Sequence, residues 1–130
     1  MIFADTSALY AVIDRDDQNH ARARILWEDL LDRSAPLLTH NYVLIEMGAL
    51  LQRRIGIFAI REFEQYVVPI LDVQWITARQ HQTAVEMVLA ANRRDLSLVD
   101  CASFVIMREH GSSQAFCFDR HFSERGIDIL

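Results

Sequence analysis

The feature that most restricts the fold is a regular alternation of short apolar segments with longer segments of helical character. The short segments are β-prone and cover residues 2 to 4, 37 to 39, 73 to 76, 115 to 118 and 127 to 129. Between them, the sequence predicts helices over residues 16 to 33, 41 to 54, 57 to 70, 77 to 93 and 97 to 110. Short strands separated by helices predict an α/β fold with a parallel sheet covered on both faces.

Length and composition are typical of one globular domain, which we expect to span residues 1 to 130. Of the residues, 52% are apolar and 24% are charged, and the chain is long enough to bury a sizeable core. The longest apolar stretches are interrupted by Glu46 or Asp100 and fall short of the roughly 20 residues of a transmembrane helix. No basic region precedes the apolar N-terminal residues, so we expect a cytoplasmic protein. Cys101 and Cys117 lack CxxC spacing and are expected to be buried free thiols.

The charge pattern narrows the possible chemistry. A net charge of −5 argues against a broadly basic surface for nucleic acid, although it leaves room for a local site. All 13 basic residues are arginines, and the absence of lysine excludes Schiff-base, P-loop and lysine-base mechanisms. Arginines such as Arg93, Arg94 and Arg120 could contact phosphate, but a general bias toward arginine explains most of them equally well.

Four acidic residues, Asp5, Glu46, Asp100 and Asp119, lie within apolar runs or directly after them. An ionised carboxylate removed from water loses several kcal/mol of solvation unless a cation or a proton compensates. In the expected fold, Asp5 and Asp119 follow strands at the carboxyl edge, where open α/β sheets bind ligands. Glu46 and Asp100 are single acids of apolar helices and should face inward. The four acids therefore predict a shared pocket, and carboxylate oxygens favour Mg²⁺ or Mn²⁺ over zinc.

Each acid also has a structural explanation when it is taken alone. Asp5 could cap the helix that follows it, and residues 97 to 100 have the S-x-x-D form of a capping box. Asp119 could open a turn, and Glu46 could be the buried partner of an arginine. A pocket is the explanation that covers all four acids together.

Several histidines and aromatic residues remain outside this pocket. His121, two residues after Asp119, could contact substrate or ligate a water, whereas the other histidines show no HExxH pattern and are expected at the surface or in packing. Tyr10 and Trp27 are expected in the core. A stripe on one helix is interpreted as core, with a protein-binding face as the alternative, and consists of Phe58, Phe63 and Tyr66.

The order of four motifs resembles that of PIN-domain ribonucleases. The motifs are Ile2 to Leu9 around Asp5, Glu46 in its apolar helix, Leu96 to Asp100, and Phe116 to Phe122 around Asp119. The resemblance runs the full length of the chain. The size and the segment from 14 to 20 look most like VapC-type toxins of bacterial toxin–antitoxin pairs.

This resemblance implies a PIN-like three-layer α/β/α domain with a central parallel sheet of about five short strands. It implies a metal-dependent endoribonuclease with Mg²⁺ or Mn²⁺ bound by Asp5, Glu46, Asp100 and Asp119. Polar residues that match positions orienting the acids or waters are Thr6, Ser7 and Ser97. The implied partners are RNA, a second copy of the chain, and a small antitoxin that blocks the pocket and carries the DNA-binding function.

One departure from the family pattern is His121, because that position is often acidic in the family, and the number of metal ions is therefore left open. Other interpretations also remain. A phospho-receiver domain would need a lysine near its site, and this chain has none. A solitary RNA-processing nuclease and a catalytically silent PIN-fold binding module share the same motifs, although the second is disfavoured because all four acids are present.

Overall fold

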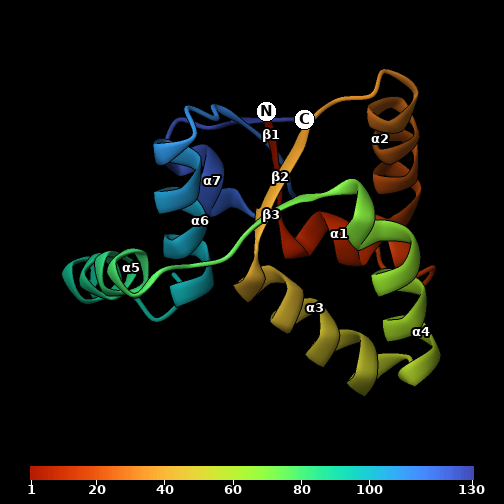
Figure 1. Ribbon diagram of the computed structural model, residues 1–130, viewed down its shortest axis with the longest axis horizontal. Helices are drawn as coiled ribbons and strands as arrows, with labels where there is room; N and C mark the ends of the chain where they lie inside the picture. Colours follow the sequence, from red (N-terminus) through yellow and green to blue (C-terminus); the bar gives the residue numbers. More distant parts are fainter.

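A five-stranded parallel sheet forms the centre of the computed structural model, which describes residues 1 to 130 (Figure 1). The strand order is β3-β2-β1-β4-β5. The strands are β1 Ile2–Ala4, β2 Leu37–His40, β3 Asp72–Gln74, β4 Gln114–Phe116 and β5 Asp128–Ile129. All neighbouring pairs are parallel. The predicted parallel sheet of about five short strands is thereby confirmed.

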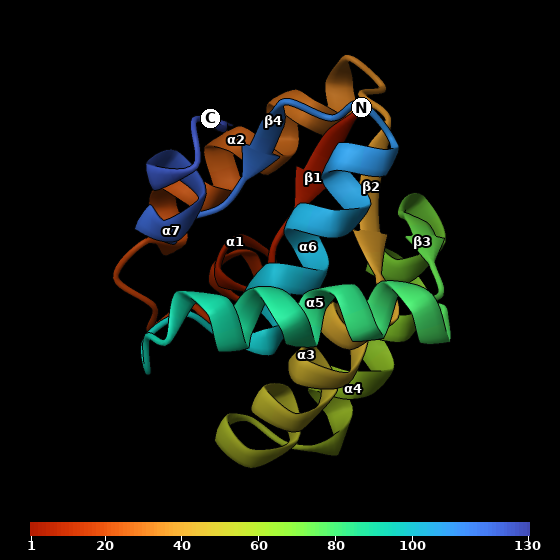
Figure 2. The ribbon, with the colours of Figure 1, turned by 90° about the vertical axis from the view of Figure 1, so that its left-hand side faces the viewer.

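Helices cover both faces of this sheet, which confirms the three-layer α/β/α arrangement. The helices are α1 Thr6–Ile13, α2 His20–Asp32, α3 Asn41–Arg54, α4 Ile57–Glu62, α5 Ala78–Ala91, α6 Leu98–Glu109 and α7 Arg120–Glu124. In Figure 1, α6 and α7 lie on one side of the strands, and α1, α2 and α4 lie on the other. Figure 2 shows α5 running across the outer side of α6. No helix is both long enough and apolar enough to cross a bilayer.

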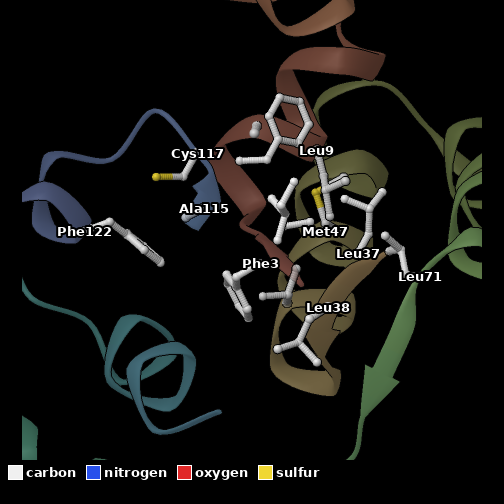
Figure 3. Close-up of a cluster of buried hydrophobic side chains, with 14 of the residues drawn as sticks. Phe3, Leu9, Leu37, Leu38, Met47, Leu71, Ala115, Cys117 and Phe122 are labelled. Carbon is white, nitrogen blue, oxygen red and sulfur yellow. The ribbon is translucent and has the colours of Figure 1, made fainter. Parts of the chain in front are cut away.

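The central strands are apolar on both faces because both faces are covered. In β1, Phe3 is fully buried and stacks on Phe122 of α7 with ring centroids 6.0 Å apart. On the opposite side, Trp27 of α2 stacks on Phe116 of β4 at 6.1 Å. The close-up in Figure 3 shows Phe3 and Phe122 together, with Leu37 placed away from them. Truncating a buried phenylalanine such as Phe3 to alanine costs about 3–5 kcal/mol of stability, so these contacts fix α2 and α7 against the sheet.

The sheet topology places two distant parts of the chain beside one another. The chain moves from β1 outward to β2 and β3, and then crosses back to add β4 on the other side of β1. At this reversal, the backbone N–H of Asp5, directly after β1, donates to the carbonyl of Phe116 at the end of β4 (3.1 Å). Ligands of open α/β sheets bind at such a switch point.

Some predicted elements differ from those observed. The helix expected over 57 to 70 is divided into α4, a π-helical turn η1 (Phe63–Val67) and a 3₁₀ turn η2 (Val68–Ile70). Pro69 lacks an N–H and cannot continue a regular helix. The helix expected from 16 begins only at His20, because the carboxylates of Asp14 and Asp17 accept the N–H groups of residues 16 and 19 and hold turns.

The expected aromatic core stripe is also only partly correct. Phe63 is buried, but the side chains of Phe58 and Tyr66 are exposed by 67% and 60%. Tyr10 and Trp27 are buried as expected, and Cys101 and Cys117 are buried free thiols. The interpretation of Phe58 and Tyr66 as core residues is therefore wrong for the isolated chain.

Candidate functional site

Asp5 lies at the carboxyl end of β1 and caps α1. Its Oδ2 accepts hydrogen bonds from Ser7 N (3.1 Å) and Ser7 Oγ (2.7 Å), and only 4% of the residue is exposed. Burial raises the pKa of Asp5 to about 7, and the charges of Asp100 and Asp119 add to this rise although the Ser7 hydrogen bonds oppose it. Asp5 therefore caps α1, as expected, and also lies near other acidic residues.

Ser7 joins the two loops that leave β1 and β4. Its hydroxyl donates to Asp5 and accepts the backbone N–H of Phe118 at 2.9 Å. This pair of bonds orients the Asp5 carboxylate and fixes the segment that leads to Asp119. The neighbouring Thr6 Oγ1 is buried and has no hydrogen-bond partner.

Asp100 comes from the first turn of α6 and is 7% exposed. It forms a capping box with Ser97, in which Asp100 N donates to Ser97 Oγ (3.0 Å) and Ser97 N donates to Asp100 Oδ2 (3.2 Å). Burial raises the pKa of Asp100, and the charge of Asp119 raises it further. The structure therefore contains the capping box of Ser97 and Asp100, and the Asp100 carboxylate in it lies near the Asp119 carboxylate.

Asp119 and His121 complete the cluster from the loop and first turn of α7. Asp119 Oδ1 accepts the backbone N–H of His121 (2.9 Å) and so caps α7. His121 Nδ1 lies 2.7 Å from Asp119 Oδ1 and 3.6 Å from Asp100 Oδ2. One ligand atom from each of Asp100, Asp119 and His121 falls within 4.8 Å of the others, a spacing that could hold a metal ion.

Glu46 has a different position from the other three acids. It is half-buried on α3 and lines a groove of about 490 Å³ between α3, α5 and α6. The groove is mostly apolar, and its other lining residues are Tyr42, Ile45, Ala49, His81, Leu98 and Val99. Leu98 and Val99 directly precede Asp100, so the groove adjoins the acidic cluster. The side chain of Glu46 lies in this groove and partly in contact with solvent, outside the group formed by Asp100, Asp119 and His121, whereas the sequence predicted an inward acid that shares the pocket.

The polar atoms of this cluster fit a divalent cation. Asp5, Asp100 and Asp119 place three carboxylates near one another, and the pKa of Asp5 is raised by burial, with a smaller contribution from the charges of Asp100 and Asp119. In addition, the buried His121 Nδ1 has no hydrogen-bond partner of good geometry. Carboxylate oxygens suit ions such as Mn²⁺ and Mg²⁺, and an imidazole nitrogen beside them suits a transition ion.

Sequence reasoning gave no role to Asp95, which contacts this cluster from the loop before α6. Asp95 Oδ2 lies 3.3 Å from His121 Nε2, and both Asp95 oxygens accept hydrogen bonds from Arg93 (3.2 and 2.9 Å). Arg93 also donates to Glu124 of α7 at 3.2 Å. Arg93, considered above for phosphate contact, is thus engaged in ion pairs within the chain. No local motif marks Asp95, because its partner His121 is 26 positions away.

Comparison with known proteins places this geometry in a family. Residues 2–127 match the PIN domain family. This chain belongs to that family. This chain is 34% identical over 128 residues to the 23S rRNA-specific endonuclease VapC20 of Mycobacterium tuberculosis, and the alignment covers 98% of this chain and 95% of that protein. The expected similarity to VapC-type toxins is confirmed.

Solved structures agree with the family assignment. The crystal structure of Mycobacterium tuberculosis VapC20, described as a toxin that cleaves the sarcin-ricin loop, superimposes with a TM-score of 0.85 at 32% identity, covering 98% of this chain and 96% of that one. FitAcB from Neisseria gonorrhoeae superimposes with a TM-score of 0.72 at 11% identity, covering 100% of this PIN domain and 96% of that chain. The second likeness concerns the fold alone.

Proposed function

We propose that this PIN domain is an endoribonuclease that acts as the toxin of a toxin–antitoxin pair. The observation that carries the proposal is the meeting of Asp5, Asp100 and Asp119 at the switch point of the sheet, in a chain similar along its length to VapC20. Three carboxylates in one cluster, of which Asp5 and Asp100 are buried, form an arrangement suited to hydrolysis of a phosphodiester.

The proposed site uses Asp5, Glu46, Asp100 and Asp119 to hold Mg²⁺ or Mn²⁺. When bound, the ion would supply positive charge for the phosphate and lower the pKa of a coordinated water. The hydrogen bonds of Ser7 and Ser97 orient the Asp5 and Asp100 carboxylates. Thr6 Oγ1, buried without a partner, is available to bind a water beside Asp5. Glu46 would complete the set from the groove, where its carboxylate is partly exposed.

The proposed substrate is RNA, with ribosomal RNA as the first candidate because VapC20 is a 23S rRNA-specific endonuclease. The groove next to Glu46 offers an aromatic and apolar surface for an unstacked base. Tyr42 Oη and His81 Nδ1 share a hydrogen bond of 2.7 Å at its rim, and the Ile45 side chain is exposed there. Bases of single-stranded RNA commonly stack on such rings.

The proposed protein partners are an antitoxin and a second copy of the chain. Large exposed apolar side chains on the α4 side of the molecule support a protein-binding face, and they are Ile57, Phe58, Tyr66 and Ile70. Others on α3 and α5 are Ile45 and Leu89. Apolar surface of this kind is typical of interfaces. DNA would be bound only through the antitoxin, and the proposed location is the cytoplasm, in keeping with an RNA substrate.

Cleavage of a total cellular RNA pool tests the proposal. Purified protein is incubated with Mn²⁺ or Mg²⁺ or with a chelator, and the ends of the products are mapped. We expect discrete cuts with metal, none with chelator, and none with the folded variant Asp100→Asn. Cuts by Asp100→Asn equal to those of the native protein would assign the activity to a contaminating nuclease and overturn the proposal. Intact RNA under every metal condition, with protein shown to be free of bound inhibitor, would also overturn it.

A further inference from the structure

His121 presents a buried nitrogen to the acidic cluster without a matching hydrogen bond. Its side chain is 10% exposed, and Nδ1 has no hydrogen-bond partner of good geometry. This nitrogen lies 2.7 Å from Asp119 Oδ1 and 3.6 Å from Asp100 Oδ2. A buried polar atom without a partner loses its hydrogen bonds to water and gains none in return, so the position of Nδ1 between two carboxylates requires a physical reason.

The other ring nitrogen defines the tautomer. His121 Nε2 lies 3.3 Å from Asp95 Oδ2, and an ionised carboxylate can only accept a hydrogen bond. Two hydrogen bonds from Arg93 hold Asp95 and keep its pKa well below the usual range. In the neutral ring, Nε2 therefore carries the hydrogen, and the lone pair of Nδ1 points toward Asp119 and Asp100.

The distances around Nδ1 agree with those between neighbouring ligands of one cation. Two ligand atoms about 2.1 Å from an ion and at right angles to each other are about 3 Å apart. The observed separations of 2.7 and 3.6 Å lie on either side of this value. In many metal sites, a carboxylate accepts a hydrogen bond from the second ring nitrogen of a ligating histidine and thereby fixes the orientation of the ring.

We propose that His121 Nδ1 is a ligand of the divalent metal held by Asp100 and Asp119, and that Asp95 is the positioning residue that orients the ring. The inference rests on the proposed function for the presence of a metal at this cluster. A nitrogen ligand makes the site more favourable for Mn²⁺, because imidazole suits transition ions and Mg²⁺ prefers oxygen. The site is therefore a mixed oxygen and nitrogen site selective for Mn²⁺ over Mg²⁺.

If His121 were a protonated cation instead of a ligand, its removal would have the opposite effect on Mn²⁺ binding. As a protonated ring, His121 would be a fixed cation that neutralises Asp119 and Asp100 and repels a metal ion. Removing the ring would then strengthen Mn²⁺ binding. If His121 is a ligand, removing the ring weakens Mn²⁺ binding, so the direction of the change separates the two roles.

Pulsed electron paramagnetic resonance of the full chain loaded with Mn²⁺ tests the proposal without using activity. We expect a ¹⁴N coupling from a coordinated imidazole, which changes to a ¹⁵N pattern in protein labelled with ¹⁵N-histidine. His121→Asn should remove this signal and lower the Mn²⁺ affinity, whereas His110→Asn, at the exposed end of α6, should retain both. Bound Mn²⁺ without nitrogen coupling, or a higher affinity in His121→Asn, would overturn the proposal while the nuclease function stands.

The role of Asp95 is tested with a matched pair of variants. Loss of a carboxylate that orients a ligating histidine commonly lowers metal affinity about 10–100-fold, and we expect this of Asp95→Asn, with the nitrogen coupling retained. Glu124→Gln removes another carboxylate bound to Arg93 but does not touch His121, so its affinity should remain within about threefold, as for exposed ion pairs. Equal losses in the two variants would overturn the role of Asp95. Native protein that binds no Mn²⁺ would overturn the metal-dependent function itself.

Discussion

At the scale of single residues, Asp5 shows how a carboxylate proposed to bind metal is kept in an unfavourable place. It is buried next to Asp100 and Asp119, which raises its pKa to about 7, yet it also caps α1 through Ser7. The cap keeps the side chain in position, and burial with like charges makes its ionised form costly. A bound cation reverses that balance because it favours the ionised form.

Asp5→Asn should abolish RNA cleavage and raise the melting temperature of the metal-free protein. Asparagine keeps an oxygen for the Ser7 hydrogen bonds but removes the buried charge. The folded-state pKa of about 7 exceeds the ordinary 3.8, so the loss of stability from Asp5 grows as the pH rises from 3.8 and is complete above pH 7. At about 1.4 kcal/mol per pKa unit, the upper limit of this effect is about 4 kcal/mol. Thermal denaturation in the presence of chelator measures it. Cleavage at the native rate by the folded variant would refute the role of Asp5.

The pH dependence of stability should change in the same variant, because the largest effect that opposes that of His40 is then removed. Burial lowers the pKa of His40 from 6.5 to about 4 in the folded state. Between these values the unfolded chain binds a proton that the folded chain does not, so the free energy of unfolding falls as the pH decreases. In the native protein, Asp5 has the opposite effect, since its folded state binds the extra proton between pH 3.8 and 7.

Denaturant titrations of metal-free protein between pH 7 and pH 4 measure this difference. Asp5→Asn should lose stability on acidification more steeply than the native protein, by up to about 3 kcal/mol across the interval. A double variant that also carries His40→Asn should lose this steepness. Identical slopes for native protein and Asp5→Asn would show that Asp5 does not retain its proton in this range.

At the scale of elements, the start of α6 supplies both stability and site geometry. The capping box of Ser97 and Asp100 satisfies N–H groups of the first turn and sets the direction of the Asp100 carboxylate. One structural motif therefore serves two purposes. The explanation of residues 97 to 100 as a cap and their explanation as part of a site are compatible.

Ser97→Ala should lower the free energy of unfolding by about 1 kcal/mol, because an N-cap hydroxyl is lost. It should also lower cleavage, because Asp100 is then less firmly oriented. Ser97→Thr keeps a hydroxyl and serves as the control, with both properties close to native. Chemical denaturation and initial cleavage rates provide the measurements. A loss of stability equal in Ala and Thr variants would exclude the cap as its cause.

Two kinds of element could be predicted from the sequence: strands buried on both faces, which are apolar throughout, and helices long enough for their apolar residues to repeat with the helical period. The strand at 2 to 4 and the helix at 41 to 54 were predicted with the observed bounds. The short helices α1 and α7 have too few turns to show periodicity. In the segment 57 to 70, apolar spacing predicted one buried helix, but Phe58 and Tyr66 face outward and the helix changes to π and 3₁₀ turns.

At the scale of the whole molecule, the strand order creates the site. Asp5 and Asp119 are far apart in the sequence and meet because β4 pairs with β1 after the chain has crossed back over the sheet. The sequence could predict this meeting because both acids follow strands. It could not predict the contact of Asp95 with His121, which depends on how a loop and α7 pack in three dimensions. The groove beside Glu46 likewise results from the packing of three helices.

The exposed apolar side chains lead to a prediction about assembly. In solution without its antitoxin, the chain should have twice the 15.0 kDa mass of one copy, as measured by light scattering after size exclusion. A charged substitution should reduce the mass to one copy if it lies in the interface. Leu89→Glu on α5 and Phe58→Glu on α4 test the two exposed apolar areas separately. A single-copy mass for the native protein at all concentrations would contradict the proposed homodimer.

The most direct test of the central claim is the position of Mn²⁺ in a crystal of this protein, located by its anomalous scattering. The claim is that Asp5, Asp100 and Asp119 form a metal site for RNA hydrolysis. The predicted result is an anomalous peak within bonding distance of carboxylate oxygens from this cluster, which is lost in crystals of Asp100→Asn. A well-occupied Mn²⁺ site elsewhere and none at this cluster, in protein that cleaves RNA, would contradict the account.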